Sequence, residues 1–486
     1  MDNDQKKAFL KVLEQAEKRH GQLLQCSPSS AKVSRLNPQL LAHIFAHSLN
    51  LKFCVKRQSY VKYNELTGVW EAMSHEAAID LTWQETLTVL RRIEAPTEFE
   101  TLVNTSLVNT TIKLLKPKIE FMEDYSESVK YFHAKNGMIV FDMKKGIWQR
   151  QNFSPEFNSF DQSEIPYGPK AKCPRFLNEL VKSAMTHEDV EILQMYLGQC
   201  LLTVNLSQTF LLLIGTPGGG KSTLVNIIEK VIGKEHCAEL RAAHTTGRFE
   251  IAGLCGKKLL TGKDVSSEFL NNAGGRALKF LTGNDTVTAE YKNSNKRVNV
   301  DGNFNIIITS NNTLRLKFDG DREAWRRRIL LLNYKNPPPV KKIANFDDVL
   351  IKEEGSGILN WMMEGATKLI ESEGAIPKNA YQKKAVDDLL KSSDPFEFFA
   401  DNFIHPVNQA SLTSAEVIEW LTKMCHKRGW DVPADRDIQV RLKKYMAENY
   451  GASQSKSIKR NGKCQRGYCN FQIGKKPIPN GLKRLD

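Results

Sequence analysis

One short segment of the chain has residue types and a spacing that could do phosphate chemistry. It runs Gly215-Thr-Pro-Gly-Gly-Gly-Lys221-Ser222 and fits the pattern G-x-x-x-x-G-K-[ST]. Glycines let backbone N–H groups approach phosphate oxygens, and a following helix N-terminus favours negative charge. In such a loop the lysine contacts the β- and γ-phosphates, and the serine hydroxyl holds Mg²⁺. The residues predicted to bind ATP are Gly215, Thr216, Pro217, Gly218, Gly219, Gly220, Lys221, Ser222 and Thr223.

The residues on either side of this segment predict a strand before it and a helix after it. The apolar run 210–214 is typical of a buried strand. After Ser222, apolar residues recur at helical spacing, and Gly233 marks the end of that helix. These apolar residues are Leu224, Ile227, Ile228, Val231 and Ile232. The order strand, loop, helix favours a phosphate-binding loop over a chance match in a glycine-rich turn.

An ATP-hydrolysing site also needs an acid that orients Mg²⁺ and the attacking water, and Asp264 is the candidate. We predict that Asp264 and Ser222 hold the metal together. The strand expected before Asp264 is weak, because Thr261, Gly262 and Lys263 interrupt its apolar run. The alternative for Asp264 is an ordinary surface turn.

Two further sites could complete the chemistry. Asn311 follows the apolar run 304–310, where its amide could orient the attacking water or, alternatively, cap a turn. Arg327 and Arg328 end an arginine cluster just before another apolar run. A planar guanidinium suits stabilisation of a transition state at the γ-phosphate, and a neighbouring subunit could donate it. The alternative is a basic surface patch or a set of internal ion pairs.

A hairpin with a basic tip follows the predicted acid. Residues 286–291 alternate like a strand, the polar segment 292–297 turns, and the chain returns through 298–300. Lys292, Lys296 and Arg297 would contact DNA phosphates if this tip projected into the pore of a ring. A simply solvated tip is the alternative.

Composition limits the classes of function that remain. The 486-residue chain has a formal net charge of +14, which favours a polyanionic partner such as nucleic acid. Its nine cysteines include no C-x-x-C pair, so a zinc ribbon is not expected and a reducing compartment is favoured. No apolar run reaches about 18 residues, so we expect no membrane span and a location in the cytoplasm of the host cell.

The chain is long enough for about three domains, and changes in pattern suggest where they divide. We predict a helical segment at 1–50, an α+β domain at 51–190, an ATPase core at 191–340, a helical lid or linker at 341–395 and a nucleic-acid-binding domain at 396–486. Pro337-Pro-Pro339 marks the end of the core, because no helix or central strand tolerates it. Ser392-Ser-Asp-Pro395 is interpreted as a linker.

The last domain combines predicted helices with a basic hairpin. Thr413-Ser-Ala-Glu416 is a capping box ahead of one helix, and a second helix is predicted at 436–449. Asn461-Gly462 is the preferred two-residue hairpin turn. Helices followed by such a hairpin resemble a winged helix, in which Lys459, Arg460 and Lys463 would bind DNA; a solvated basic tail is the alternative.

Taken in order, these motifs resemble the superfamily III helicases, most closely the helicase part of phage and plasmid primase-helicases, which poxvirus-type proteins share. The resemblance covers about residues 55–480. It is carried by the glycine-rich loop, Asp264, Leu281-Thr-Gly-Asn-Asp285 with its hairpin, Ser310-Asn311 and Trp325-Arg-Arg-Arg328, and also by segments 136–142, 171–174, 196–198, 357–361 and 364–365.

The resemblance implies an α/β fold with a P-loop, AAA+-like parallel-sheet core, an α+β N-terminal domain and a C-terminal winged helix. Its implied roles are Asp264 as the Walker B acid, Asn311 as the sensor and Arg327 or Arg328 as a finger acting across subunits. The family often has Glu at the position of Asp264, which leaves the general base open, with Glu268 as a weak substitute.

The predicted function is therefore an ATP-dependent DNA helicase that forms a ring, expected to be a hexamer, and acts in replication of a phage, plasmid or other mobile element. The resemblance implies that it moves 3′ to 5′. Expected partners are single- and double-stranded DNA, further copies of the chain and a separate primase or polymerase. The alternative is an origin-binding or recruitment protein that uses ATP only as an assembly switch. An RNA-directed motor is a third possibility.

Overall fold

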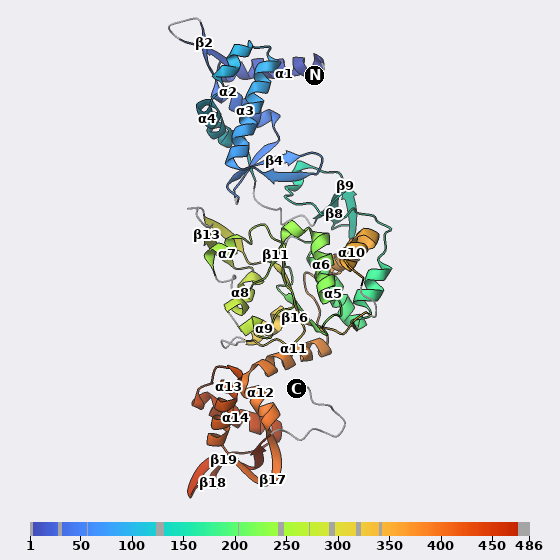
Figure 1. Ribbon diagram of the computed structural model, residues 1–486, viewed down its shortest axis with the longest axis vertical. Coiled ribbons are helices and arrows are strands. Elements are labelled where there is room, and N and C mark those ends of the chain that lie inside the picture. The colour runs from blue at the N-terminus through green and yellow to red at the C-terminus, as the bar shows by residue number, and fades with distance from the viewer. Residues whose placement is uncertain are drawn as a thin grey trace.

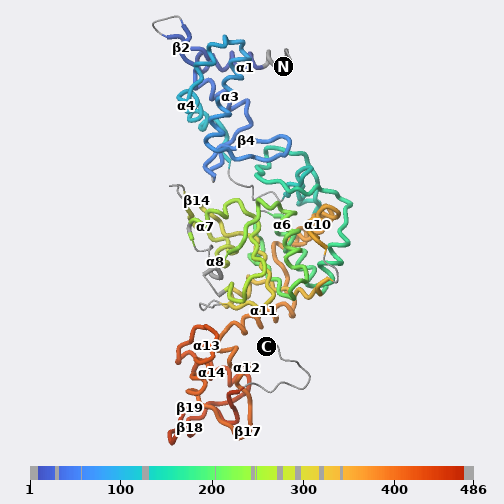
Figure 2. The backbone as a smooth tube through the Cα atoms, viewed as in Figure 1, coloured from blue at the N-terminus to red at the C-terminus, as the bar shows by residue number. Residues whose placement is uncertain are grey.

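The computed structural model describes residues 3–27, 32–55, 57–122, 131–202, 204–241, 247–271, 273–290, 297–316, 322–339 and 343–474. The fold is mixed α/β with several sheets, one of which is parallel and five-stranded. Figure 1 shows an elongated molecule with the N-terminal region at one end, the parallel sheet in the middle and the C-terminal region at the other end, and the tube in Figure 2 follows the same path. Within the described residues, no helix has both the length and the apolarity to cross a bilayer.

The N-terminal region, blue in Figure 1, packs helices against a small mixed sheet. Its elements are α1 (Asn3–His20), β1 (Leu24–Cys26), β2 (Val33–Leu36), α2 (Pro38–Ser48), β3 (Leu51–Cys54), β4 (Ser59–Asn64), β5 (Val69–Ala72), α3 (His75–Arg92), a 3₁₀ helix (Thr97–Leu102), α4 (Thr105–Leu115), a 3₁₀ turn (Lys116–Lys118) and β6 (Glu120–Met122). The sheet order is β5-β4-β3-β6. One apolar core joins Leu41 of α2 to Val108 of α4, so segment 1–50 packs into the region that follows it. The β1–β2 hairpin in that segment was not predicted.

A three-stranded antiparallel sheet leads from this region to the middle of the molecule. Its strands are β7 (Tyr131–Ala134), β8 (Gly137–Asp142) and β9 (Ile147–Gln151). After β9 the chain forms a 3₁₀ turn (Pro155–Phe157), a π-helix (Phe176–Val181) and α5 (His187–Gln199). The indole N–H of Trp148 on β9 donates to Met363 O at 3.2 Å and to Thr367 Oγ1 at 2.9 Å. Both acceptors lie on α10 (Phe346–Glu371), so this sheet is attached to the core.

The central sheet is apolar on both of its faces. Its elements are β10 (Phe210–Gly215), α6 (Lys221–Ile232), a 3₁₀ turn (Lys234–His236), β11 (Cys237–Glu239), α7 (Arg248–Ala252), β12 (Leu259–Gly262), a 3₁₀ turn (Phe269–Asn271), α8 (Ala273–Leu281), β15 (Asn305–Ser310), α9 (Arg322–Arg328) and β16 (Ile329–Tyr334). The strand order is β11-β12-β15-β10-β16, and every neighbouring pair is parallel. Along β10, Leu211 and Leu213 face α5, α6 and α10, whereas Phe210 and Leu212 face α8, α9 and α11 (Ala380–Ser393). Helices on both faces explain the unbroken apolar run of this strand.

Helix α10 lies beside α5 because two glycines leave room for direct contact between the helix backbones. A Cβ on Gly198 would lie 2.1 Å from the backbone nitrogen of Ala366. A Cβ on Gly365 would lie 1.9 Å from the carbonyl oxygen of Gln194. No side chain fits at either position, and in Figure 1 α10 accordingly lies on the same side of the core as α5 and α6.

The hairpin predicted after the acid is present in its two strands, β13 (Thr286–Glu290) and β14 (Arg297–Asp301), which pair antiparallel. Of its predicted tip at 292–297, residues 292–296 lie outside the described residues, and Arg297 is the first residue of β14. The hairpin is attached to the core through Ala289, Val298 and Val300, which are buried with α8.

The predicted linker Ser392–Pro395 is instead a direct junction between two helices. Only Asp394 separates α11 from α12 (Pro395–Phe403). The Asp394 carboxylate accepts the backbone N–H of Glu397 at 2.9 Å, and it pairs with Arg441 at 2.7 Å. Asp394 is the N-cap of α12 and Pro395 its first residue, roles that these residues fill as readily as a loop.

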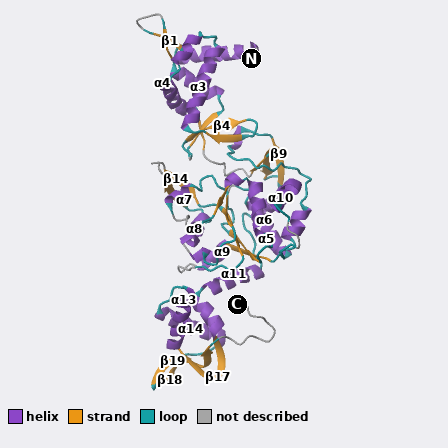
Figure 3. Ribbon diagram, viewed as in Figure 1, coloured by secondary structure: helices purple, strands orange, loops and turns teal. Residues whose placement is uncertain are grey.

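The C-terminal region has its own apolar core, to which both its helices and its three-stranded antiparallel sheet contribute. Figure 3 shows these helices and strands together at the end of the molecule. Besides α12 it contains β17 (Ile404–Thr413), α13 (Ser414–Arg428), α14 (Asp435–Tyr450), β18 (Ser455–Arg460) and β19 (Lys463–Ile473), in the sheet order β17-β19-β18. The predicted capping box between Thr413 and Glu416 is present. Asn461 and Gly462 have φ of 48° and 75°, as the predicted two-residue turn requires. Strand β17 was not predicted.

Candidate nucleotide-binding site

The glycine-rich loop leaves β10 at the carboxyl edge of the parallel sheet and ends where α6 begins. A Cβ on Gly215 would lie 1.7 Å from the carbonyl oxygen of Tyr334 on β16, so only glycine fits there. Gly220 caps α6 with a φ of 99°, which glycine adopts without strain. A loop at the carboxyl ends of parallel strands, followed by a helix N-terminus, is where open α/β sheets bind anionic ligands.

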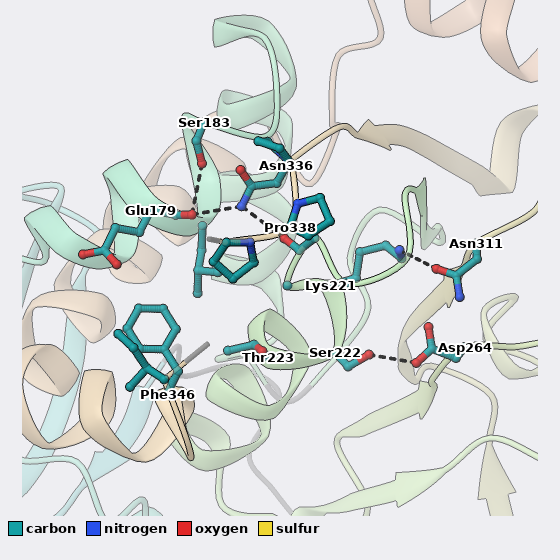
Figure 4. A pocket seen from close by; sticks show the side chains of 17 residues that line it. Glu179, Ser183, Lys221, Ser222, Thr223, Asp264, Asn311, Asn336, Pro338 and Phe346 are labelled. Atoms are coloured by element: carbon teal, nitrogen blue, oxygen red, sulfur yellow. Dashed lines mark hydrogen bonds between the residues drawn. The ribbon is translucent and has the colours of Figure 1, made fainter. Parts of the chain in front are cut away.

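Lys221 is the first residue of α6, and three oxygen atoms hold its amine at the mouth of the loop. Its Nζ donates to Gly215 O at 2.9 Å, to Thr216 O at 2.8 Å and to Asn311 Oδ1 at 2.8 Å. Only 3% of the residue is exposed, and this burial lowers the pKa of the amine, while the nearby Asp264 carboxylate opposes the change. The predicted lysine and the predicted sensor amide therefore meet at one point (Figure 4).

Asp264 meets Ser222 at the same edge of the sheet. The Ser222 hydroxyl donates to Asp264 Oδ2 at 3.0 Å. Asp264 has a φ of 50°, in the left-handed region, and its backbone N–H donates to Thr309 Oγ1 at 2.9 Å. That hydrogen bond from β15 holds the acid in an uncommon conformation and directs its carboxylate toward the serine. A hydroxyl and a carboxylate are oxygen ligands of the kind Mg²⁺ prefers, so the two side chains fit the metal predicted for them.

The polar residues that weakened the predicted strand β12 have partners on α6. Thr261 Oγ1 donates to Glu229 Oε1 at 2.7 Å. Lys263 Nζ donates to Glu229 Oε2 and to Asn226 Oδ1, both at 2.7 Å. All four residues of β12 are buried. The polar residues thus attach the strand that carries the acid to the helix that follows the glycine loop.

Lys221, Ser222, Asp264 and Asn311 line one cleft of about 730 Å³. Of the predicted nucleotide-binding residues, 218–223 line it, whereas Thr216 and Pro217 are exposed at the loop tip. The lining residues that the sequence did not predict are Glu179, Leu180, Ser183, Asn336, Pro337, Pro338, Pro339, Ile343 and Phe346. They come from the π-helix and the turn after it, the segment after β16 and the start of α10, which Figure 4 shows around the loop.

Asn336 is the most connected of the residues that sequence reasoning missed. Its Nδ2 donates to Glu179 O at 3.0 Å and to Gly219 O at 3.1 Å, and its own carbonyl accepts the Thr216 hydroxyl at 3.0 Å. Asn336 therefore holds the glycine loop against the π-helix. From the sequence, the prolines after it mark only the end of the core. Their place shortly after the apolar run that follows Arg328 is the signal that could have assigned them to the carboxyl end of a strand, and so to the cleft.

Glu268, the weak substitute for a general base, is outside the lining of the cleft. Its carboxylate accepts a hydrogen bond from Arg315 at 3.0 Å. Of the acids considered from the sequence, only Asp264 is placed beside Lys221 and Ser222.

The arginine cluster lies at the opposite edge of the sheet. Strand β16 runs from Ile329, beside Phe210, to Tyr334, beside Gly215. Five residue steps of about 3.3 Å separate the two ends by about 17 Å, and α9 with its arginines precedes the far end. The structure therefore does not bring Arg327 or Arg328 into the cleft of their own chain.

The two candidate arginines differ in their surroundings. Arg328 is 7% exposed. Its guanidinium and the Asp285 carboxylate both lie beside Gly283, because a Cβ built on that glycine would be 3.1 Å from each of them. Arg327 is exposed. The backbone beside them is held by Lys378, whose Nζ donates to the carbonyl oxygens of Arg326, Arg327 and Ile329 at 3.0, 3.1 and 2.8 Å.

The predicted DNA-contacting residues also fall into different settings. Lys292 and Lys296 lie outside the described residues, and Arg297 is at the start of β14, 3.3 Å from Glu290. On the C-terminal hairpin, Lys459 and Lys463 are exposed. The third residue there, Arg460, points back into its own domain. It donates to Glu416 at 2.8 Å and to the Ser411 hydroxyl at 3.1 Å.

Comparisons with known proteins relate this chain to one family model and to solved structures of similar fold. Residues 213–328 match a family model described as a family of unknown function, DUF5906. The matched segment begins in β10 and ends with α9, so it contains the glycine loop, Asp264 and Asn311. No curated protein matches the chain.

Among solved structures, the chain is similar to the apo structure of the C-terminal region (305–718) of NrS-1, with 15% identity and a TM-score of 0.51. That match covers 90% of this chain and 99% of the other. A second structure, the A form of the same NrS-1 region, gives 15% identity and a TM-score of 0.50, with 90% and 100% covered. At this identity the likeness concerns the fold, and it extends over nearly the whole chain.

Proposed function

We propose that this protein is an ATP-dependent DNA helicase that works as a ring in the replication of a phage, plasmid or other mobile element. One observation carries the proposal. Lys221, Ser222, Asp264 and Asn311 come from three separate segments, and their side chains pair with one another at one edge of the parallel sheet. A glycine loop, an ammonium, an acid and an amide in one cleft are the parts that ATP hydrolysis needs.

Each group in the cleft has a defined task in this proposal. The loop and Lys221 would bind the β- and γ-phosphates, because phosphate oxygens can replace the three oxygens that now accept from the amine. Asn311 would then be released to orient the attacking water. Ser222 and Asp264 would hold Mg²⁺, which neutralises charge on the phosphate oxygens when bound. This supports a P-loop, AAA+-like assignment for the core.

The opposite edge of the sheet supports an oligomer. A guanidinium about 17 Å along the strand direction from its own glycine loop can act on a γ-phosphate only if another copy supplies it. Exposed Arg327 meets that condition better than buried Arg328. A closed ring provides every cleft with such a neighbour, and the family resemblance favours six copies.

Two basic regions support DNA as the partner, in keeping with the net charge of +14. The β13–β14 hairpin would carry one strand by its phosphates. The C-terminal region has three helices and an antiparallel sheet that includes an exposed basic hairpin, which supports a winged helix that engages duplex DNA. Movement from 3′ to 5′ and cooperation with a separate primase or polymerase rest on the resemblance alone.

A recruitment protein that uses ATP only as a switch is the alternative, and the polar strand before Asp264 is the sequence feature that favours it. That polarity now has a structural explanation, because Thr261 and Lys263 bind Glu229 on α6. The Asp264→Asn variant separates the two proposals. A helicase should lose strand separation with this change, whereas a switch should keep its function as long as ATP still binds.

The test of the proposed function is ATP turnover with and without single-stranded DNA or RNA, with the mass of the particle measured by light scattering. We expect a ring whose turnover is stimulated by DNA more than by RNA. Lys221→Ala should reduce turnover about 10²-fold or more, the usual cost of removing a preorganised donor. Lys234→Ala, an exposed lysine just after the same helix, is the matched control and should retain activity. A monomer whose ATP turnover ignores DNA would contradict the helicase proposal.

A further inference from the structure

The C-terminal region touches the core at two points. Arg322, at the start of α9, makes two hydrogen bonds of 2.6 and 2.8 Å to the carboxylate of Glu397 on α12. A second contact joins Arg315, in the segment after β15, to Trp430, just after α13, with 5.2 Å between the guanidinium and the ring centroid. The second contact reaches residues beside the cleft.

Arg315 connects the two loops that carry the candidate catalytic groups. Its backbone N–H donates to Ser267 O at 2.9 Å, and its guanidinium donates to Glu268 at 3.0 Å. Both acceptors follow Asp264 on the loop after β12. Arg315 itself lies four residues after Asn311 on the loop after β15. Arg315 therefore contacts the loop that follows Asp264, while it belongs to the same loop as Asn311.

The two loops are also bonded to each other, so a displacement at Arg315 would reach both. The N–H groups of Asp264 and Val265 donate to the Thr309 hydroxyl and carbonyl, each at 2.9 Å. The Ser310 hydroxyl donates to Val265 O at 3.0 Å. Such a network of hydrogen bonds and packed backbone can carry coupling between sites.

On the other side of the contact, Trp430 is fixed to the body of the C-terminal region. Its backbone N–H donates to Cys425 O at 2.8 Å, at the end of α13. Its ring packs edge-on against Phe398 of α12 at 5.3 Å, and Arg428 lies 5.5 Å from the same ring. Trp430 must therefore move with α12 and α13, and a planar guanidinium stacked on it would follow.

We propose that Arg315 is a positioning residue through which the C-terminal region and the nucleotide cleft influence each other. This inference rests on the proposed function, because it requires ATP in the cleft and DNA on the C-terminal region. Nucleotide binding would shift the loops after β12 and β15, and Arg315 would pass that shift to Trp430. By thermodynamic linkage, DNA bound to the C-terminal region would change nucleotide affinity by the same factor.

The test measures that factor in the full-length protein. The dissociation constant for a fluorescein-labelled DNA duplex is compared with and without a non-hydrolysable ATP analogue and Mg²⁺, and the analogue's dissociation constant is compared with and without duplex. In the wild type we expect both to change by about fivefold or more, the lower end of typical coupling. Arg315→Lys keeps the charge opposite Glu268 but loses the planar stacking surface, and Trp430→Leu removes the ring. Both variants should bring the factor close to one.

Trp420→Leu is the matched control, because Trp420 is a half-exposed tryptophan on α13 of the same region. It should keep the wild-type factor. If Trp430→Leu fails to fold, Arg315→Lys decides the question, since Arg315 lies outside the C-terminal region. Wild-type coupling in Arg315→Lys would overturn the inference. DNA-stimulated turnover without any linkage in the wild type would overturn it and leave the proposed function standing, whereas a wild type that binds no nucleotide would overturn both.

Discussion

The two edges of the parallel sheet carry two sets of polar and charged groups, and these sets are built differently. At the carboxyl edge, Lys221 pairs with Asn311 and Ser222 pairs with Asp264, so the polar groups hold one another in place. At the other edge, α9 presents cations, and most of them are used inside the chain. Arg326 pairs with Asp387 and Glu323, whereas Arg327 is exposed.

This difference fits the proposed function, in which one copy would hold the groups that bind ATP and another copy would supply the arginine. At the carboxyl edge, the donors and acceptors of the cleft already satisfy one another. The exposed guanidinium at the other edge lacks a role within its own chain's cleft. The four changes below test this division, beginning with the largest expected effect.

Removing the exposed arginine should abolish most of the activity without harming the fold. We expect Arg327→Ala to lower ATP turnover about 10³-fold, the lower range for an arginine finger, with a melting temperature close to that of the wild type. Mixing it with Lys221→Ala should restore part of the activity, because some interfaces then combine an intact cleft with an intact arginine. Arg328→Ala should instead lower the melting temperature, since that side chain is buried. Absence of rescue on mixing would break the comparison between the edges.

At the carboxyl edge, neutralising the acid should reduce chemistry more than binding. Asp264→Asn keeps the size of the side chain but removes the charge opposite Ser222 and Mg²⁺. We expect ATP turnover to fall about 10²-fold, while the dissociation constant of a fluorescent ATP analogue changes by only a few-fold. Glu268→Gln is the matched control and should have a smaller effect on turnover. The reverse order would make Glu268 the acid of the site.

Lys378, which binds the backbone carbonyls at the end of α9, should contribute to the stability of the fold. Lys378→Met leaves three backbone carbonyls without their donor and should cost about 1–3 kcal/mol in the free energy of unfolding, measured by denaturant titration. Burial lowers the pKa of Lys378 to about 8 from its usual 10.5, with Lys383 adding to the effect. Between these values the unfolded chain binds more protons at this position than the folded one, so wild-type stability rises with pH. The difference between wild type and variant should therefore be larger at pH 10 than at pH 7.

The smallest effect is expected on the C-terminal hairpin, where exposed Lys459 lies next to Arg460, whose guanidinium is hydrogen-bonded within its own domain. Lys459→Ala should weaken DNA binding a few-fold and reduce the slope of log affinity against log salt by about 1. Arg460→Ala should leave that slope nearly unchanged and lower stability instead, because its guanidinium binds Glu416 and Ser411. Fluorescence anisotropy with labelled DNA over a series of salt concentrations measures both. Equal slopes for the two variants would contradict the distinction.

The sequence was sufficient for features that local pattern determines. The strand, loop and helix around Lys221 and the turn at Asn461-Gly462 follow from glycine geometry and apolar spacing, and the structure contains them. Asp264 and Asn311 could be selected because each follows a strand of the sheet. Their pairing with Ser222 and Lys221 required the strand order, which places β15 beside β10 and β12 on the other side of β15.

Other features depended on distant segments and could not be predicted. Asn336 contacts Glu179 across more than 150 positions, and no local pattern indicates that contact. Arg327 and Arg328 are adjacent in sequence, and only the direction in which α9 enters β16 decides which is buried. Thr261 interrupts the apolar pattern of its strand, and only the position of Glu229 on α6, which accepts its hydroxyl, explains why it is tolerated there. In each case a partner far along the chain decides the environment.

The contact between α5 and α10 also limits how this protein can change in evolution. Most buried contacts tolerate drift, because a larger residue on one side can be offset by a smaller one opposite. Where Gly198 faces the backbone at Ala366, and Gly365 faces the backbone at Gln194, the opposing surface has no side chain to shorten. A methyl group at either glycine could be accommodated only by moving the whole helix. A substitution at either glycine therefore cannot be offset by a change in the opposing residue. Descendants of this chain should keep both glycines or lose the packing of α10 against α5.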